Sequence, residues 1–122
     1  MIWTLIQVAI GGALGAVSRY GTVQVVAKSF GSSFPYGTLL VNVGGSLLMG
    51  FLFVALSGSR LSPLFLTGFL GGFTTFSAFS LDAVRLWEEG QITAAAVYIG
   101  TSIALSILGL VVGLLIARSV LS

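Results

Sequence analysis

Apolar residues form four long stretches of this chain, and short polar segments separate them. A helix needs about 20 apolar residues to cross a hydrocarbon layer about 30 Å thick. Stretches of this length predict four transmembrane helices over residues 2–26, 35–56, 64–87 and 92–117. These spans use most of the 122 residues, so we expect an all-α membrane protein with a single domain over residues 1–122.

The polar segments contain signals for where the helices begin and end. Pro35 and Pro63 each suit the first turn of a helix, and Ser62 suits the position that caps it. Residues 28–34 are expected to form the first loop, and Arg118 is expected to end the last helix.

The third stretch contains glycines and hydroxyl-bearing residues in mid-membrane. Gly71 and Gly72 are adjacent, and each glycine weakens a helix by about 1 kcal/mol relative to alanine. We therefore expect a break there, and a break frees carbonyls that lipid cannot satisfy. Such carbonyls can bind an ion, as in discontinuous transporter helices. Alternatively, Gly68 and Gly72 form a helix-packing surface, and the spacing leaves both interpretations open.

Polar residues recur every four positions on the second and fourth stretches. The two lines are Thr38, Asn42 and Ser46, and Tyr98, Ser102 and Ser106. Residues four apart lie on one helix face. The lines predict either a polar pathway between the two helices or interhelical hydrogen bonds that stabilise packing.

Composition excludes several classes of protein. Hydrophobic residues make up 57% of the chain and charged residues 7%, which excludes a soluble enzyme and a disordered chain. Histidine and cysteine are absent, which removes imidazole and thiol catalysis and most transition-metal sites. The basic residues are too scattered to bind nucleic acid; they are Arg19, Lys28, Arg60, Arg85 and Arg118.

No acidic residue lies in the middle of a span. Asp82, Glu88 and Glu89 are at or beyond the end of the third span, whereas an exporter of protons or cationic drugs would need an acid in mid-span. Hydroxyl and amide donors without fixed negative charge suit a small anion. Phe73, Phe76 and Phe79 are expected on one face, where they either pack in the core or present positive ring edges to an anion.

The basic residues barely select an orientation in the membrane. Four spans place both termini and the Arg60 loop on one side, with Arg118, and Lys28 and Arg85 on the other. This balance predicts either dual insertion, with an antiparallel homodimer, or an orientation set weakly by other features. Arg19 either snorkels to one surface or supplies a positive charge at a pore mouth.

Three motifs together resemble the microbial fluoride channel family. They are the segments GGALGAVSRY at 11–20, GTLLVNVGG at 37–45 and GFLGGFTTFSAF at 68–79. The resemblance implies an antiparallel, dual-topology homodimer in the bacterial inner membrane, with two pores that export fluoride passively from the cytoplasm. Ala78 stands where the family commonly has threonine.

The resemblance also implies roles for individual residues. Phe76 and Phe79 resemble the pore phenylalanines, and Asn42 resembles the pore amide donor. Tyr98, Ser102 and Ser106 resemble the polar track of the fourth helix, with Thr38 and Ser77 or Ser80 nearby. Arg19 resembles a vestibule arginine, and Gly71 and Thr74 resemble positions whose backbone carbonyls, doubled by the dimer axis, hold a structural sodium ion.

Two other functions are compatible with four spans. A small multidrug-type exporter shares the length and the dual topology, but the first span here contains no glutamate. A non-transporting membrane subunit would leave the polar lines and the broken helix without a purpose beyond packing. The expected partners are therefore fluoride, membrane lipid and a second copy of the chain.

Overall fold

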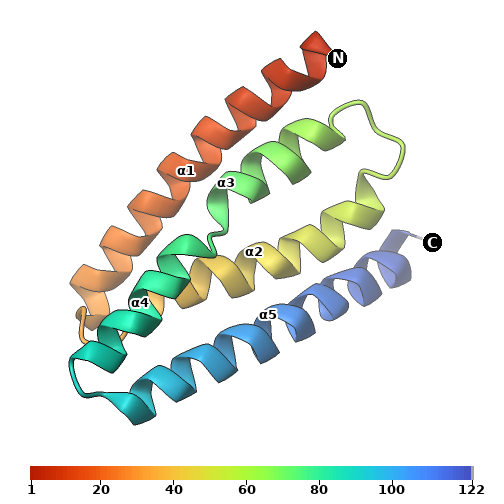
Figure 1. Cartoon of the computed structure of the whole chain (residues 1–122). Coiled ribbons are helices and arrows are strands. Elements are labelled where there is room, and N and C mark those ends of the chain that lie inside the picture. Colours follow the sequence, from red (N-terminus) through yellow and green to blue (C-terminus); the bar gives the residue numbers. More distant parts are fainter. Residues whose placement is uncertain (122) are drawn as a thin grey trace.

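The computed structural model describes residues 1–121 as long helices, and spans that are consecutive in the chain run in opposite directions (Figure 1). The elements are α1 (Ile2–Phe30), α2 (Tyr36–Ala55), η1 (Pro63–Leu70), α3 (Gly71–Phe73), α4 (Ser77–Glu88) and α5 (Ile92–Leu121). The third span consists of η1, α3 and α4 in succession. Within this described part of the chain, four helical segments are long and apolar enough to cross a membrane: α1, α2, residues 63–88 and α5.

The predicted helices are all present, with small differences at their ends. The helix α1 continues through Lys28 to Phe30, so the expected loop over 28–34 is shorter than predicted. Pro35 precedes the second helix, and the Ser62 side chain makes no capping hydrogen bond, although Pro63 does start η1. Arg118 does not end α5, which runs to Leu121, because an arginine has good helix propensity and its charge suits a last turn.

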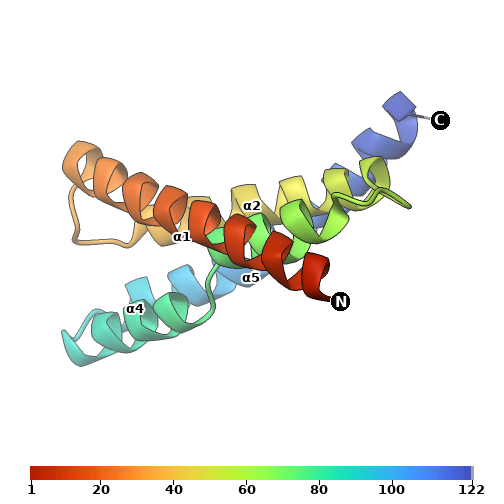
Figure 2. The ribbon, with the colours of Figure 1, turned by 90° about the horizontal axis from the view of Figure 1, so that it is seen from above.

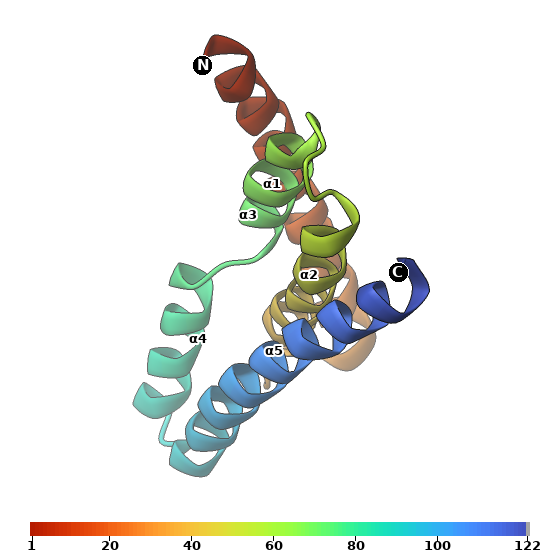
Figure 3. The same cartoon turned by 90° about the vertical axis from the view of Figure 1, so that its right-hand side faces the viewer.

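The helices pack as two groups that meet at α2. The helix α1 lies along η1 and α3, whereas α2 lies along α5 and α4 contacts mainly α5. Viewed from above, α1 and α4 diverge toward the end that carries the first loop (Figure 2). From the side, α4 is clearly displaced from α3, and a short non-helical segment connects them (Figure 3).

The third span is broken as expected, but the break begins at Thr74, after the glycine pair. Gly71 and Gly72 are helical, and the chain becomes extended at Thr74, with φ −86° and ψ 158°. Helix resumes at Ser77. The expectation of a break at the glycine pair was therefore wrong in position.

The glycines of the third span serve close packing against α1. A Cβ atom at Gly68 would lie 3.0 Å from the Gly11 Cα, and one at Gly72 would lie 2.6 Å from the Gly12 carbonyl oxygen. The small side chains let the two backbones approach. The packing interpretation of Gly68 and Gly72 is thus confirmed, while Gly71 faces away from α1 and has nothing closer than 3.9 Å.

The buried core is small for a chain of this length. Its main cluster joins α4 to α5 and consists of Phe79, Ala83, Leu86, Ala95 and Tyr98. Large apolar side chains are exposed along every long helix, as with Leu14, Phe53 and Ile107. Such extensive apolar exposure is tolerated in lipid but not in water.

Candidate functional site: a polar cavity at the break

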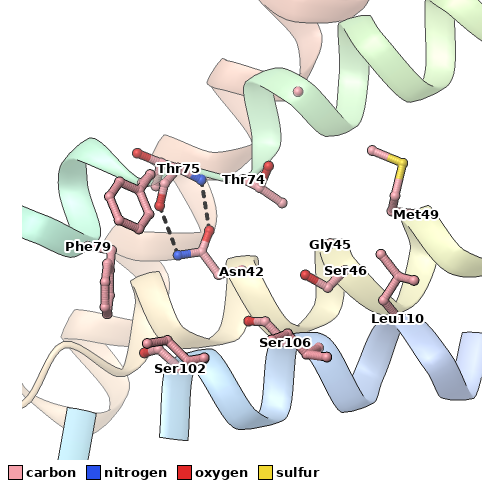
Figure 4. Close-up of a pocket in the computed structure, with 14 residues that line it drawn as sticks. Asn42, Gly45, Ser46, Met49, Thr74, Thr75, Phe79, Ser102, Ser106 and Leu110 are labelled. Carbon is pink, nitrogen blue, oxygen red and sulfur yellow. Dashed lines mark hydrogen bonds between the residues drawn. The ribbon is translucent and has the colours of Figure 1, made fainter. Parts of the chain in front are cut away.

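A cavity of about 540 Å³ lies where the break faces α2 and α5 (Figure 4). Three of the four spans line it. The lining residues are Asn42, Gly45, Ser46 and Met49 of α2; Gly71, Thr74, Thr75, Phe76 and Phe79 of the third span; and Ser102, Ile103, Ser106, Ile107 and Leu110 of α5. The structure thus brings four residues of the two polar lines, Asn42, Ser46, Ser102 and Ser106, to one space.

Ser102 supplies a buried hydroxyl without a hydrogen-bond partner. Its side chain is 5% exposed, and within residues 1–121 no protein atom is hydrogen-bonded to its Oγ. A buried hydroxyl without a partner costs about 1–3 kcal/mol. Such a group in a cavity wall is available to a ligand that enters the cavity.

Asn42 holds the extended chain of the break. Its Nδ2 donates to the Thr75 carbonyl at 2.9 Å, and its Oδ1 accepts from the Thr75 backbone N–H at 2.7 Å (Figure 4). The break removes helical partners from both Thr75 groups, so this pair replaces them. One of the two Nδ2 hydrogens is used in this way, and the second is free to bind a ligand.

Neighbouring residues satisfy most of the other backbone groups at the break. Arg19 donates from Nε to the Gly72 carbonyl at 3.1 Å. Its guanidinium is therefore directed toward the break. The backbone N–H and hydroxyl of Thr74 both donate to the Leu70 carbonyl. The Thr75 hydroxyl accepts from the Ala78 N–H at 3.1 Å, which supports the start of α4.

The Gly71 carbonyl loses its helical donor at the same place. In an uninterrupted α-helix it would accept from the Thr75 N–H, but that group donates to Asn42. Backbone carbonyl oxygens are hard ligands that suit alkali and alkaline-earth cations. Gly71 and Thr74 are both in the cavity wall, so the chemistry of their carbonyls fits the predicted sodium site.

The three phenylalanines expected on one face of the third span do not share a face. Phe76 is 76% exposed and Phe79 is 8% exposed, with ring centroids 5.4 Å apart at the cavity. Phe73 instead stacks on Phe69 at 5.8 Å. The expectation of a single face was wrong because the extended chain at Thr74 separates Phe73 from the later helix.

Four of the predicted pore residues lie outside the cavity wall. Tyr98 is fully buried, packs on Phe79 and donates its hydroxyl to Asp82 Oδ2 at 3.1 Å. Thr38 is buried on α2. Ser80 donates to the Phe76 carbonyl at 2.9 Å, and the Ser77 hydroxyl lies 3.4 Å from that of Thr75.

Sequence reasoning missed several residues that the structure brings into use. Thr75 and Met49 line the cavity, and Gln7 is a buried amide that donates to the Arg60 carbonyl. For Gln7 a signal existed, since it is an amide in an apolar span. For Thr75 no pattern in the sequence specified which side of the break would face α2, and Met49 is an apolar residue that the polar lines do not include.

Comparison with known proteins matches this chain to one family over most of its length. Residues 6–114 match the family described as "CrcB-like protein, Camphor Resistance (CrcB)". A "Fluoride-specific ion channel FluC" of Cereibacter sphaeroides is 56% identical over 120 residues, which cover 97% of each chain. Proteins of the same name are 50% identical in Ruegeria sp., over the whole of both chains, and 49% identical in Paracoccus denitrificans, over 94% of both. With a match of this extent, the chain is an integral membrane protein that belongs to the CrcB family.

Proposed function

We propose that this protein is a fluoride-specific ion channel that lets fluoride leave the cytoplasm passively. Its curated relatives carry that name at up to 56% identity over nearly the whole chain. The structural observation that carries the proposal is the cavity at the break, whose wall has amide and hydroxyl donors and, within residues 1–121, no acidic side chain. A negative charge in the wall would repel an anion.

In this proposal, donors in the wall replace part of the water around fluoride. The unpartnered Ser102 hydroxyl and the free Nδ2 hydrogen of Asn42 are the first of these donors, with Ser46 and Ser106 further along the same two helices. The edges of the Phe76 and Phe79 rings carry partial positive charge and complete the passage. The remaining polar residues lie outside the cavity wall, where they either support it or line the continuation of the fluoride passage. They are Tyr98, Thr38, Ser77 and Ser80.

The proposed functional unit is an antiparallel homodimer with two pores in the bacterial inner membrane. Phe76 is exposed beside an open cavity, and a second copy would cover both. The backbone carbonyls of Gly71 and Thr74, two residues of the cavity wall, are the groups that would hold a sodium ion, doubled by the second copy. Bound there, the ion would neutralise the partial charges of the carbonyls and join the two breaks.

The test is efflux from liposomes that contain the purified protein. On addition of a potassium ionophore we expect the vesicles to release fluoride and to retain chloride. Phe76→Ile should slow fluoride efflux by about tenfold, because it removes the ring edge and keeps apolar bulk. Phe53→Ile is the matched control, since Phe53 is an exposed phenylalanine on α2 outside the cavity wall.

Two outcomes would contradict the proposal. Vesicles that release neither ion would indicate a membrane subunit that does not transport. Release of fluoride and chloride at equal rates would indicate a pore without the proposed selectivity.

A further inference from the structure

One face of α1 carries a polar residue at each end and two glycines between them. Gln7, Gly11, Gly15 and Arg19 are spaced by four, so they lie in line on the helix. The first three are the buried residues of α1. We refer to this set as the Gln7–Arg19 face, and it lies against η1 and α3, the elements that precede the break.

The N-terminal end of this face, at Gln7, binds the chain just before η1. Gln7 is 3% exposed, and its Nε2 donates to the Arg60 carbonyl at 2.9 Å. An amide at membrane depth is costly unless it is hydrogen-bonded. The bond therefore gives the Gln7 Nε2 group a partner and fixes where η1 begins on α1.

The C-terminal end of the face, at Arg19, binds the chain just before the break. The Gly72 carbonyl would accept from the Phe76 N–H in an uninterrupted helix, but it accepts from Arg19 Nε instead, at 3.1 Å. A hydrogen bond from a charged donor is roughly twice as strong as a neutral one. Arg19 thus stabilises the carbonyl that the break would otherwise leave without a donor.

The glycines between the two ends bring the backbones into direct contact. A Cβ atom at Gly11 would collide with the Leu64 carbonyl oxygen, and one at Gly15 with that of Phe69. Both side-chain hydrogen bonds join residues 53 positions apart in sequence. The same offset at both ends shows that α1 and the first half of the third span run in parallel and in fixed register.

We propose that Gln7 and Arg19 are positioning residues, which fix the two ends of the η1–α3 segment on α1 and so hold the break at Asn42. The inference rests on the proposed channel function and goes beyond it. Thr75 is three residues after Gly72, so a shift of α3 along α1 would move Thr75 away from Asn42 and change the cavity wall. In this role the hydrogen-bonding geometry of Arg19 matters in addition to its charge.

The test uses two substitutions with matched controls on the full chain. Gln7→Met keeps the size of the side chain and removes the donor, and Arg19→Lys keeps the charge and removes the Nε group. The controls are Gln24→Met, at an exposed position of α1, and Arg118→Lys, at an exposed position of α5. We expect both test variants to slow fluoride efflux at least about tenfold, and both controls to match the wild type.

The second measurement does not depend on ion flow. In hydrogen exchange followed by mass spectrometry, peptides that contain Thr75 should exchange about tenfold faster in both test variants, because the Asn42–Thr75 pair opens more often. If Gln7→Met does not assemble, Arg19→Lys alone decides the question.

The outcomes separate this inference from the proposed function. Wild-type exchange at Thr75 in Arg19→Lys would overturn the positioning role, even if efflux fell. Wild-type efflux in Arg19→Lys would show that charge alone is sufficient and would also overturn it. A wild-type protein that conducts no fluoride would reject the channel function, while the exchange measurement would still decide the positioning role.

Discussion

Two neighbouring hydroxyls on α5 have opposite surroundings. Thr101 donates to the Val97 carbonyl of its own helix at 2.7 Å, whereas the Ser102 hydroxyl has no partner within residues 1–121 and borders the cavity. The Thr101 hydroxyl is therefore satisfied within its own helix, whereas the unpartnered Ser102 hydroxyl lowers the stability of the fold. A residue that costs stability in the free protein is expected to act on a ligand.

Ser102→Ala should therefore separate stability from conduction. We expect fluoride efflux from liposomes to fall about tenfold, because one donor to the anion is lost. The melting temperature in detergent should stay equal or rise, because an unsatisfied buried hydroxyl is removed. Thr101→Ala is the control and should leave efflux unchanged. A lower melting temperature with normal efflux for Ser102→Ala would place its hydroxyl in packing alone.

At this scale the sequence predicted the residue types better than their partners. From the spacing of four, we predicted that polar residues share one face of each helix, and four of them line one cavity: Asn42, Ser46, Ser102 and Ser106. It could not show that Asn42 would bind the backbone of Thr75, because that bond depends on where a distant segment is broken. For the same reason, nothing in the spacing indicated that Tyr98 would donate to Asp82.

Glycines determine how closely the long helices α2 and α5 cross. A Cβ atom at Gly50 would collide with the Leu110 carbonyl oxygen, and one at Gly113 would collide with that of Leu47 and lie 2.9 Å from the Phe51 nitrogen. Each helix thus presents a glycine to the backbone of the other. This close contact lies one helical turn beyond Ser46 and Ser106, so the two polar lines end where the backbones meet.

Gly113→Ala should push the two helices apart. We expect the free energy of unfolding in detergent to fall by about 1–3 kcal/mol, because the added methyl group has no space. Gly100→Ala, on the same helix, has nothing within 4 Å of the new Cβ. It should leave stability equal or raise it by up to about 1 kcal/mol through helix propensity. Equal effects of the two substitutions would contradict this account of the crossing.

The position of the break shows the limit of element prediction. Helix propensity alone placed it at Gly71 and Gly72, yet the chain opens at Thr74. Packing against Gly12 keeps Gly72 in helix, and Asn42 stabilises the extended form of Thr75. Both effects come from other helices, so only the existence of a break, and not its register, was available from the third span itself.

At the scale of the whole molecule, the structure places equal numbers of basic residues at the two ends. Both termini and the loop with Arg60 lie at one end, and the loops after α1 and α4 lie at the other (Figure 1). The first end has Arg60 and Arg118, and the second has Lys28 and Arg85. Arg19 is hydrogen-bonded to the break between them, so it does not alter the balance of two against two.

A single added lysine should therefore fix the orientation. Ser29→Lys and Ser57→Lys add charge at opposite ends, each at an exposed position, and short-loop charges direct insertion. We expect copies of the parent chain to insert both ways and each lysine variant to insert one way, in opposite senses. The chain has no cysteine, so one cysteine at Ser33 and a membrane-impermeant maleimide would measure the fraction of copies in each orientation.

Fluoride efflux from cells provides a second and independent measurement of how the equal charges at the two ends affect insertion. If the working unit is an antiparallel dimer, either lysine variant alone should lose fluoride efflux from cells, because no oppositely inserted copy is present. Expression of both variants together should restore efflux, since each supplies the orientation that the other lacks. Ser29→Gln and Ser57→Gln control for the loss of serine and should behave as the parent chain. Full efflux from one variant whose copies all face the same way would show that a parallel assembly or a single copy conducts, and the near-equal charges would then have no role in assembly.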